Sequence, residues 1–197
     1  MTVYLVGAGP GDPGLLTLRG RQLLERCDAL VYDRLADPRI VGMARAGAEL
    51  HDAGKQPGRH TMTQAQINEL LVGLGGRHQT VVRLKGGDPF IFGRGGEEAL
   101  VLDAAGIAWE VVPGISSAYA VPAYAGIPVT HRGMAAQVTI VTGHEDPAKP
   151  GTDRDWAHLA RPPGTLVCRM GVSSLAANRA RRLAVGMAPA TPAPCPR

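Results

Sequence analysis

The first stretch whose residue types suit binding chemistry is the glycine- and proline-rich segment "GAGPGDPG" at residues 7–14. Its last six residues fit the pattern G-x-G-x-x-G, which binds a dinucleotide pyrophosphate when it follows a strand and opens a helix. A second apolar run, "ALVYD", ends in Asp33, about where a dinucleotide-binding domain places its ribose-binding acid. The pattern therefore raises the hypothesis of a nicotinamide or flavin enzyme.

Two prolines argue against that hypothesis. The dinucleotide motif works because backbone N–H groups approach the phosphates at a helix N-terminus. Pro10 and Pro13 have no N–H, so two donors of the cradle are missing. Asp12 and Pro13 suit the cap and first position of a helix. Helix initiation, a ligand other than phosphate and, least favoured, a dinucleotide are the interpretations that remain open for this loop alone.

A second glycine-rich loop lies in "VVRLKGGDPFIFGRGGEE" at residues 81–98, directly after an apolar strand. Ligands of open α/β sheets bind just beyond the carboxyl ends of the strands. Gly86 and Gly87 expose backbone N–H and C=O groups at such an end, and Asp88 adds a carboxylate. This combination suits a ligand with an amine, an amide-like base or a positive charge better than a phosphate. The two phenylalanines that follow favour the wall of a pocket.

The elements that must position these loops alternate between short apolar runs and helical patterns, which indicates an α/β fold. Several runs are apolar throughout, as in parallel strands that are covered on both faces. We expect strands at residues 3–6, 29–32, 48–51, 80–84, 109–112, 138–142 and 165–170. We expect helices at residues 15–26, 38–45, 64–74, 97–105, after Gly114 through residue 125, around 156 and at 173–185.

The segment "VVPGISS" at residues 111–117 interrupts this alternation. The sequence therefore predicts an N-terminal α/β domain at residues 1–112 and a C-terminal α/β domain at residues 113–187. Prolines at every second or third position near the end forbid a helix or a central strand, so residues 188–197 are predicted to be a disordered tail.

Composition excludes several classes of protein. The chain is 45% hydrophobic, so it can bury a core, and only 4% aromatic, which argues against a surface that stacks nucleic-acid bases. Its net charge of +4 comes from scattered cations rather than from a basic stripe. No signal peptide or run of transmembrane length is visible, and the three cysteines and six histidines lack the spacing of metal ligands. We expect a reduced, cytoplasmic, metal-free protein that binds neither nucleic acid nor membrane.

Six segments together resemble one family, the S-adenosylmethionine-dependent tetrapyrrole methylases: "GAGPGDPGLLT", "VYDRL", "GKQPGRHTMTQAQIN", "RLKGGDPFIFGRGGEE", "VPGISSA" and "GIPVTHRG". The resemblance extends from residue 2 to about residue 190, with the motifs in the expected order. It implies two α/β domains with the methyl donor in a cleft between them. The loop ending in "GRGGEE" is its most specific feature, and the "GKQPGRH" segment selects the member that acts on uroporphyrinogen III.

The resemblance implies a set of residues that contact S-adenosylmethionine, namely Pro10, Gly86, Gly87, Asp88, Ile91, Phe92, Ser116, Ser117 and Met170. Three of them have a purely structural alternative. Phe92 and Met170 would serve equally as core residues, and Ser116 as a helix cap.

The implied reaction transfers methyl groups from the sulfonium to two pyrrole carbons of uroporphyrinogen III, giving precorrin-2 on the route to sirohaem and cobalamin. Asp33 is the candidate general base, or the group that stabilises the developing pyrrole cation. The carboxylate-rich substrate needs directed cations. The candidates are Lys55, Arg59, His60, Arg94, His131 and Arg132. The family also implies a homodimer.

The chain departs from the family at its end, where the relatives continue for several further strands. The second domain is therefore predicted to be incomplete. Three alternatives remain: an inactive or donor-binding fragment, a sibling methylase acting on a later precorrin, and, outside the family, a nicotinamide oxidoreductase.

Overall fold

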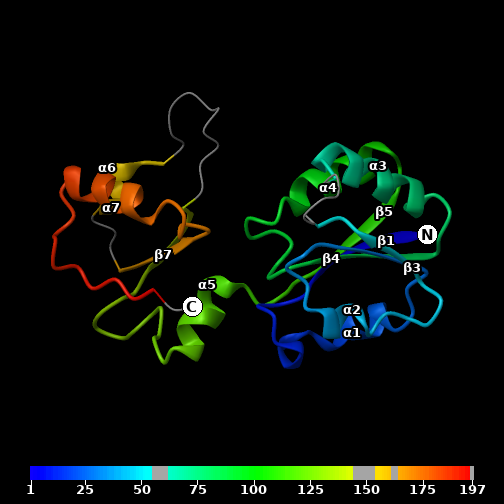
Figure 1. Cartoon of the computed structure of the whole chain (residues 1–197), viewed down its shortest axis with the longest axis horizontal. Coiled ribbons are helices and arrows are strands. Elements are labelled where there is room, and N and C mark those ends of the chain that lie inside the picture. The colour runs from blue at the N-terminus through cyan, green and yellow to red at the C-terminus, as the bar shows by residue number, and fades with distance from the viewer. Residues whose placement is uncertain (55–61, 144–153, 161–163, 196–197) are drawn as a thin grey trace. The chain divides into compact units, whose positions relative to one another are not determined.

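The computed structural model describes residues 1–54, 62–143, 154–160 and 164–195 (Figure 1). The chain forms two compact units, Met1–Ser117 and Ala118–Arg197. The sequence placed the boundary after residue 112, and the structure places it after Ser117, because the "PGISS" segment belongs with the first unit.

The first unit is built on a five-stranded sheet with the order β3-β2-β4-β1-β5. The strands are β1 (Thr2–Gly7), β2 (Ala29–Tyr32), β3 (Glu49–Asp52), β4 (Thr80–Lys85) and β5 (Ala108–Val112). All neighbouring pairs are parallel, so the carboxyl ends of all five strands lie at one edge. Each strand expected from the sequence in this unit is present, with bounds that differ by at most one residue.

Helices cover both faces of this sheet (Figure 1). They are α1 (Leu18–Leu24), α2 (Pro38–Val41), α3 (Gln64–Gly75) and α4 (Gly95–Ala104). Val3 and Leu5 of β1 pack toward α3 and α4, whereas Val6 packs toward α1 and α2. Because both faces are buried, these strands are apolar along their whole length.

Two helices of the first unit are shorter than predicted. A 3-10 turn (Pro13–Leu15) precedes α1, and the Oγ1 of Thr17 accepts a hydrogen bond from the Gly20 N–H (3.1 Å), so the α-helix starts only at Leu18. The helix α2 ends at Val41, and the Arg45 N–H instead donates to the Leu24 carbonyl (2.9 Å).

The second unit contains a two-stranded parallel sheet of β6 (Val138–Thr142) and β7 (Thr165–Arg169). Its helices are α6 (Trp156–Ala160) and α7 (Leu175–Ala184), and α5 (Ser117–Tyr124) leads into it. The Arg182 Nε donates to the Leu159 carbonyl (3.1 Å), which ties α7 to α6. Residues 188–195 carry neither helix nor strand.

Within the described ranges, no helix is long and apolar enough to cross a membrane. The same ranges hold no group of three or more histidine, cysteine, aspartate or glutamate side chains arranged to hold a metal ion.

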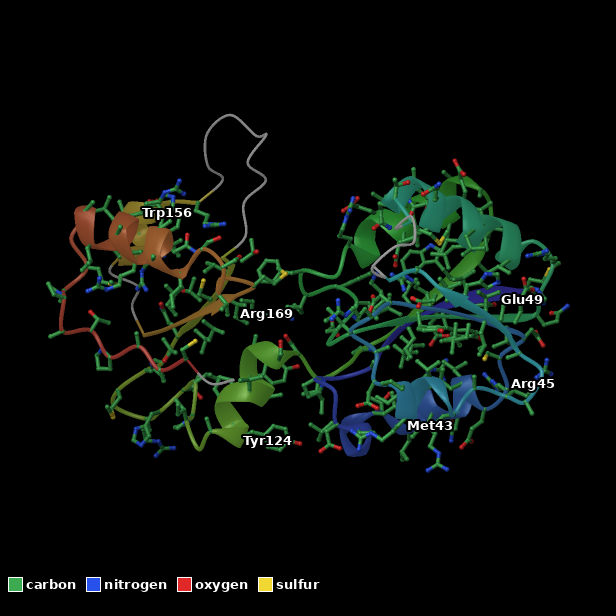
Figure 2. The ribbon with its side chains drawn as sticks, in the orientation of Figure 1. Met43, Arg45, Glu49, Tyr124, Trp156 and Arg169 are labelled. Carbon is green, nitrogen blue, oxygen red and sulfur yellow. The ribbon has the colours of Figure 1, made fainter. Side chains whose placement is uncertain are left out.

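An ionic cluster on the edge strand β3 makes stability depend on pH. Glu49 lies hydrogen-bonded to the Nε2 of His78 (3.0 Å) and of His51 (2.9 Å) (Figure 2). The bond to His78, with the one to His51 and the charge of Arg77, lowers the pKa of Glu49 below its ordinary value of 4.5. A lowered carboxylate pKa stabilises the fold above 4.5, and this contribution is lost as the pH falls through the folded-state pKa.

We therefore expect Glu49→Gln to lower the urea midpoint of unfolding at about pH 7, and to lower it by less near pH 3, below the ordinary pKa of 4.5. Unfolding curves at both pH values measure this. A deficit of the same size at both pH values would show that the carboxylate charge is not responsible.

Candidate functional site

Two glycine-rich loops meet at the carboxyl edge of the sheet in the first unit. The Gly9 N–H donates to the Gly87 carbonyl (3.1 Å), and the Gly87 N–H donates back to the Gly9 carbonyl (2.7 Å). Both glycines have positive φ, 75° and 70°, which a residue with a Cβ rarely adopts. The loop after β1 and the loop after β4 therefore form one continuous surface, which includes Pro10 and residues 86–88.

A third loop, after β5, closes against the first two. A Cβ atom on Gly114 would lie 2.2 Å from the Gly87 carbonyl oxygen and 2.7 Å from the Gly7 Cα. The backbones of Gly7, Gly87 and Gly114 are thus in direct contact, and no side chain fits between them. We call these three residues the glycine contact. It brings the segment that carries Ser116 and Ser117 to the same edge.

The opening loop starts a helix rather than cradling a phosphate. Two amides at the start of this turn are already used: the Gly14 N–H donates to the Asp12 Oδ1 (2.8 Å), and the Leu15 N–H donates to the Asp12 carbonyl (3.0 Å). With Pro10 and Pro13 lacking an N–H, this leaves a poor site for a pyrophosphate. The helix-initiation interpretation is confirmed, with a 3-10 turn in place of the expected α-helix.

Asp88 organises the loop after β4. Its Oδ1 accepts a hydrogen bond from the Phe90 N–H (2.8 Å), and its Oδ2 accepts one from the Gly114 N–H (3.0 Å). Both carboxylate oxygens thus bind backbone amides, one within the loop and one across to the loop after β5. The side chain fixes the shape of the surface that the two loops form.

Strained backbone marks three of the residues expected to bind a ligand. Among the described residues, Phe92, Arg94 and Met170 are the non-glycine residues with positive φ, at 53°, 58° and 54°. Such conformations cost about 1–3 kcal/mol and concentrate at binding sites. Phe92 is 42% exposed and Met170 51% exposed, so the alternative that they are core residues is wrong.

The neighbouring donor candidates differ in burial. Ile91 is 37% exposed beside Phe92, whereas Ser116 is fully buried. Ser117 is the first residue of α5.

Asp33 lies directly after β2, beside the loop of Gly86. Its Oδ1 accepts a hydrogen bond from the Leu35 N–H (3.1 Å), and its carbonyl accepts one from the Ala36 N–H (3.0 Å). A Cβ atom on Gly86 would lie 2.6 Å from the Leu35 Cβ, so the turn of Asp33 packs against the glycine loop. The structure brings this acid and the loop together at the carboxyl edge of the sheet.

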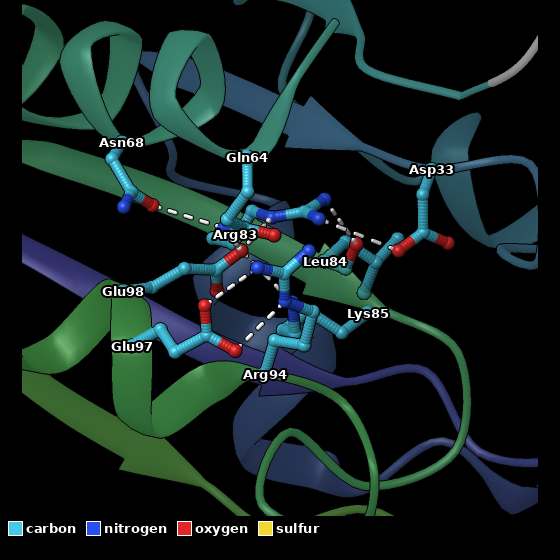
Figure 3. Close-up of polar contacts among 9 residues, drawn as sticks. All are labelled: Asp33, Gln64, Asn68, Arg83, Leu84, Lys85, Arg94, Glu97 and Glu98. Carbon is cyan, nitrogen blue, oxygen red and sulfur yellow. Dashed lines mark hydrogen bonds and ion pairs between the residues drawn. The ribbon is translucent and has the colours of Figure 1, made fainter. Parts of the chain in front are cut away.

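Sequence reasoning missed a buried ionic cluster beneath this edge (Figure 3). The Oε1 of Glu98 on α4 accepts hydrogen bonds from the Lys85 Nζ (2.9 Å) and the Arg83 Nε (3.1 Å), both on β4. The three side chains are 5% exposed or less. Burial, with the nearby charge of Arg83, lowers the pKa of Lys85, and the Glu98 carboxylate opposes this shift. The signal was present: two cations at alternate positions of an apolar strand share one buried face.

The predicted substrate cations fall into three groups. Arg94 is already paired, since its Nε and Nη2 donate to Glu97 at 2.8 and 2.6 Å. His131 and Arg132 lie in an exposed turn of the second unit, where the His131 Nδ1 is 2.9 Å from the Arg132 carbonyl. Lys55, Arg59 and His60 lie outside the described residues.

The second unit repeats the close approach of glycines beside its own predicted ligand residue. A Cβ atom on Gly143, after β6, would lie 2.3 Å from the Cα of Gly171, after β7. The Asn178 Nδ2 donates to the Gly143 carbonyl (3.1 Å) and holds this contact to α7. Met170 lies between β7 and Gly171, so it projects from a loop that has little freedom to move.

Comparisons with known proteins agree with this architecture. The family Tetrapyrrole (Corrin/Porphyrin) Methylases matches residues 2–193. Over 190 residues, 96% of this chain, the sequence is 56% identical to an S-adenosyl-L-methionine-dependent uroporphyrinogen III methyltransferase of Methanosarcina barkeri and covers 74% of that protein. It is 53% identical to a uroporphyrinogen-III C-methyltransferase of Synechocystis, of which it covers 72%.

A solved structure is similar over the same length. The uroporphyrin-III C-methyl transferase from Thermus thermophilus, complexed with S-adenyl homocysteine, superposes with a TM-score of 0.80 at 42% identity. The match covers 96% of this chain and 78% of that one. Together with the parallel sheet, the two units and the glycine loops, these matches show that the chain belongs to the tetrapyrrole methylase family.

Proposed function

We propose that this protein transfers methyl groups from S-adenosylmethionine to two pyrrole carbons of uroporphyrinogen III, which forms precorrin-2. The observation that carries the proposal is the glycine contact, which joins three strand-end loops into one surface beside Asp33. The archaeal and cyanobacterial relatives, both named for methylation of this substrate, support the choice of substrate. The Thermus relative with S-adenyl homocysteine supports the choice of donor.

The donor is a cationic sulfonium with an apolar side and a polar adenosine. The exposed side chains of Ile91 and Phe92 offer the apolar wall, and the half-buried backbone of Gly86 lies at the strand end just before them. We propose that the donor contacts these residues together with Pro10, Gly87, Asp88, Ser116, Ser117 and Met170.

In the chemical step, the electron-rich pyrrole carbon attacks the methyl carbon, and the electrons of the S–CH₃ bond remain on sulfur. The donor thereby becomes S-adenosylhomocysteine, whose thioether sulfur is neutral. The methyl group is already activated, so alignment of carbon, methyl and sulfur supplies most of the rate. The methylated pyrrole is cationic. Asp33, whose side chain is 26% exposed, stabilises that charge and accepts a proton that leaves.

The substrate carboxylates need cations, and Arg94 offers one only if Glu97 shares it or releases it. Because this pair is more than half exposed, separating it costs little, about 1 kcal/mol or less. We propose Arg94, His131 and Arg132, with Lys55, Arg59 and His60, as the residues that bind the carboxylates. A homodimer in the cytoplasm stays a prediction, for which sedimentation equilibrium measures the oligomeric state.

The test combines binding and turnover on the full chain. Purified protein is titrated with S-adenosylhomocysteine and, separately, with NADH, and precorrin-2 formation from uroporphyrinogen III is followed by absorbance. We expect binding of the homocysteine analogue, no binding of NADH, and turnover. Binding without turnover would leave a donor-binding protein and refute the proposed activity, and NADH binding alone would refute the donor as well.

A substitution at Asp88 tests the donor surface. Asp88→Asn replaces one oxygen by an NH₂ group that cannot accept from the Phe90 or the Gly114 N–H. Loss of one charge-assisted bond of about 1.5–3 kcal/mol predicts an affinity for S-adenosylhomocysteine at least about 10-fold lower, measured by calorimetry. Asp103→Asn, at the exposed end of α4, is the matched control and should bind normally. Equal affinities of the two variants would show that Asp88 does not shape the donor site.

A further inference from the structure

Four charged side chains are joined by successive contacts beneath the carboxyl edge of the sheet (Figure 3). Lys85 contacts Glu98, Glu98 contacts Arg83, and the Arg83 Nη2 lies 3.5 Å from the Asp33 Oδ2. The first three side chains are almost fully buried, and Asp33 is the member that reaches solvent. These contacts therefore connect buried charges to the proposed base.

Burying a cluster of charged side chains is an unfavourable way to stabilise a fold. Removing ions from water costs several kcal/mol each, and an apolar set of similar volume is often as stable or more stable. The interior neighbours on this face, Val3, Leu5 and Val81, are apolar and pack against α3 and α4. An almost fully buried charged cluster beside them, in contact with Asp33, points to a task at the sheet edge.

Arg83 is held in one orientation by contacts along its whole guanidinium. Nε donates to the Glu98 Oε1 (3.1 Å), and Nη1 donates to the Leu84 carbonyl (3.3 Å), which leaves Nη2 directed at Asp33. Glu98 is fixed in turn, because its Oε1 also accepts from the Lys85 Nζ (2.9 Å) and the Gln64 Nε2 (3.4 Å). A planar guanidinium fixed at two points leaves its third nitrogen little freedom.

We propose that Arg83 is a positioning residue, which holds the Asp33 carboxylate in its reactive orientation and is itself anchored by Glu98. Arg83 fixes the Oδ2 of Asp33 while the Leu35 N–H fixes the Oδ1, so that both oxygens have set positions. The inference rests on the proposed function, in which Asp33 is the group that acts on the substrate.

The substitution Arg83→Lys distinguishes a role of Arg83 in positioning Asp33 from a role in the stability of the core alone. Its ammonium lies one bond short of Nη2, so it retains the charge and the reach to Glu98 but not the contact to Asp33. A matched control exists at the amino end of β2, the strand that Asp33 follows. Asp28 precedes β2 and pairs with the Nη2 of Arg45 (3.0 Å), away from the carboxyl edge (Figure 2). Arg45→Lys makes the same change in an Arg–Asp pair that has no task in the site.

We expect Arg83→Lys to lower kcat about 100-fold with the KM for S-adenosylmethionine within about twofold of normal, because a misplaced reactive group costs rate rather than donor binding. Arg45→Lys should keep kcat within about twofold. The amide of Leu35 provides a second measurement by hydrogen exchange. Freeing the Asp33 carboxylate should speed this exchange in Arg83→Lys but not in Arg45→Lys.

Normal kcat or unchanged Leu35 exchange in Arg83→Lys would overturn the proposal. If that variant does not fold, Arg83→Gln takes its place, since Lys85 alone then neutralises Glu98, and the same two outcomes decide. Absence of methylation by the unaltered protein would refute the proposed function separately. The exchange rate of Leu35 would still show whether Arg83 holds the carboxylate.

Discussion

Glu98→Ala is expected to destabilise the first unit by about 3–5 kcal/mol, because it leaves the buried cations Arg83 and Lys85 without their shared carboxylate. The neighbouring substitution Glu97→Ala removes an exposed partner of Arg94 and should cost no more than about 1 kcal/mol. Adjacent glutamates on the same helix thus differ several-fold in effect, since one faces the sheet and the other faces solvent.

The chain offers a probe for this measurement. Its two tryptophans are divided between the units, with Trp109 on β5 and Trp156 on α6. In a Trp156→Phe background, fluorescence during urea unfolding reports only the first unit. Similar midpoints for Glu98→Ala and Glu97→Ala would refute the assignment of Glu98 as the buried counter-ion.

The loss of stability caused by Glu98→Ala should become smaller as the pH rises. Glu98 raises the pKa of Lys85 against the lowering effect of burial, so its removal lowers that pKa further. Above the new folded-state pKa, Lys85 is neutral in the folded protein and still protonated when unfolded, so stability rises with pH. The gap to the unaltered protein should therefore be smaller at about pH 9 than at about pH 7.

Gly114→Ala is the second change with a large expected effect. Its Cβ would lie 2.2 Å from the Gly87 oxygen, so the backbones of two loops must separate. Overpacking of this kind costs about 1–3 kcal/mol of stability. The effect on catalysis should be larger, with kcat/KM about 100-fold lower, because the donor surface itself moves. Calorimetry with S-adenosylhomocysteine and the methylation assay measure the loss.

Gly73→Ala makes the same chemical change with the opposite expected sign. Gly73 lies in α3, and a Cβ there would meet no atom within 4 Å. Alanine should stabilise this helix by about 0.5–1 kcal/mol and leave donor affinity unchanged. If Gly114→Ala also bound the donor normally, the glycine contact would have no part in the site.

The sheet and the place of the loops could be predicted from the sequence for a physical reason. Parallel strands covered on both faces are continuous apolar runs, and ligand loops follow their carboxyl ends. On that basis Asp33 and Gly86 were expected at one edge, and their turns do pack together. The bounds of short helices were less predictable, because caps such as Thr17 decide where a helix begins.

The buried ionic cluster of Arg83, Lys85 and Glu98 could not be predicted in the same way. The expected strand ended at Leu84, which left Lys85 in a loop, and the partner Glu98 lies on a helix whose contact with the sheet depends on tertiary packing. The positive φ of Phe92 and Met170 was equally hidden, since nothing in these residue types favours it. The pairing of Arg94 with Glu97 was hidden as well, because Arg94 is the left-handed N-cap of α4 and lies before the helix that the sequence predicted.

The strand order determines which loops of the site stay in place when an edge strand of the sheet opens locally. The loops of Pro10, Asp33 and Asp88 follow β1, β2 and β4, each of which has a neighbour on both sides, whereas β3 and β5 form the edges. Edge strands open at lower free energy than interior ones. Fraying of β3 would thus leave the three loops in place, while fraying of β5 would release Gly114 and Ser116 first.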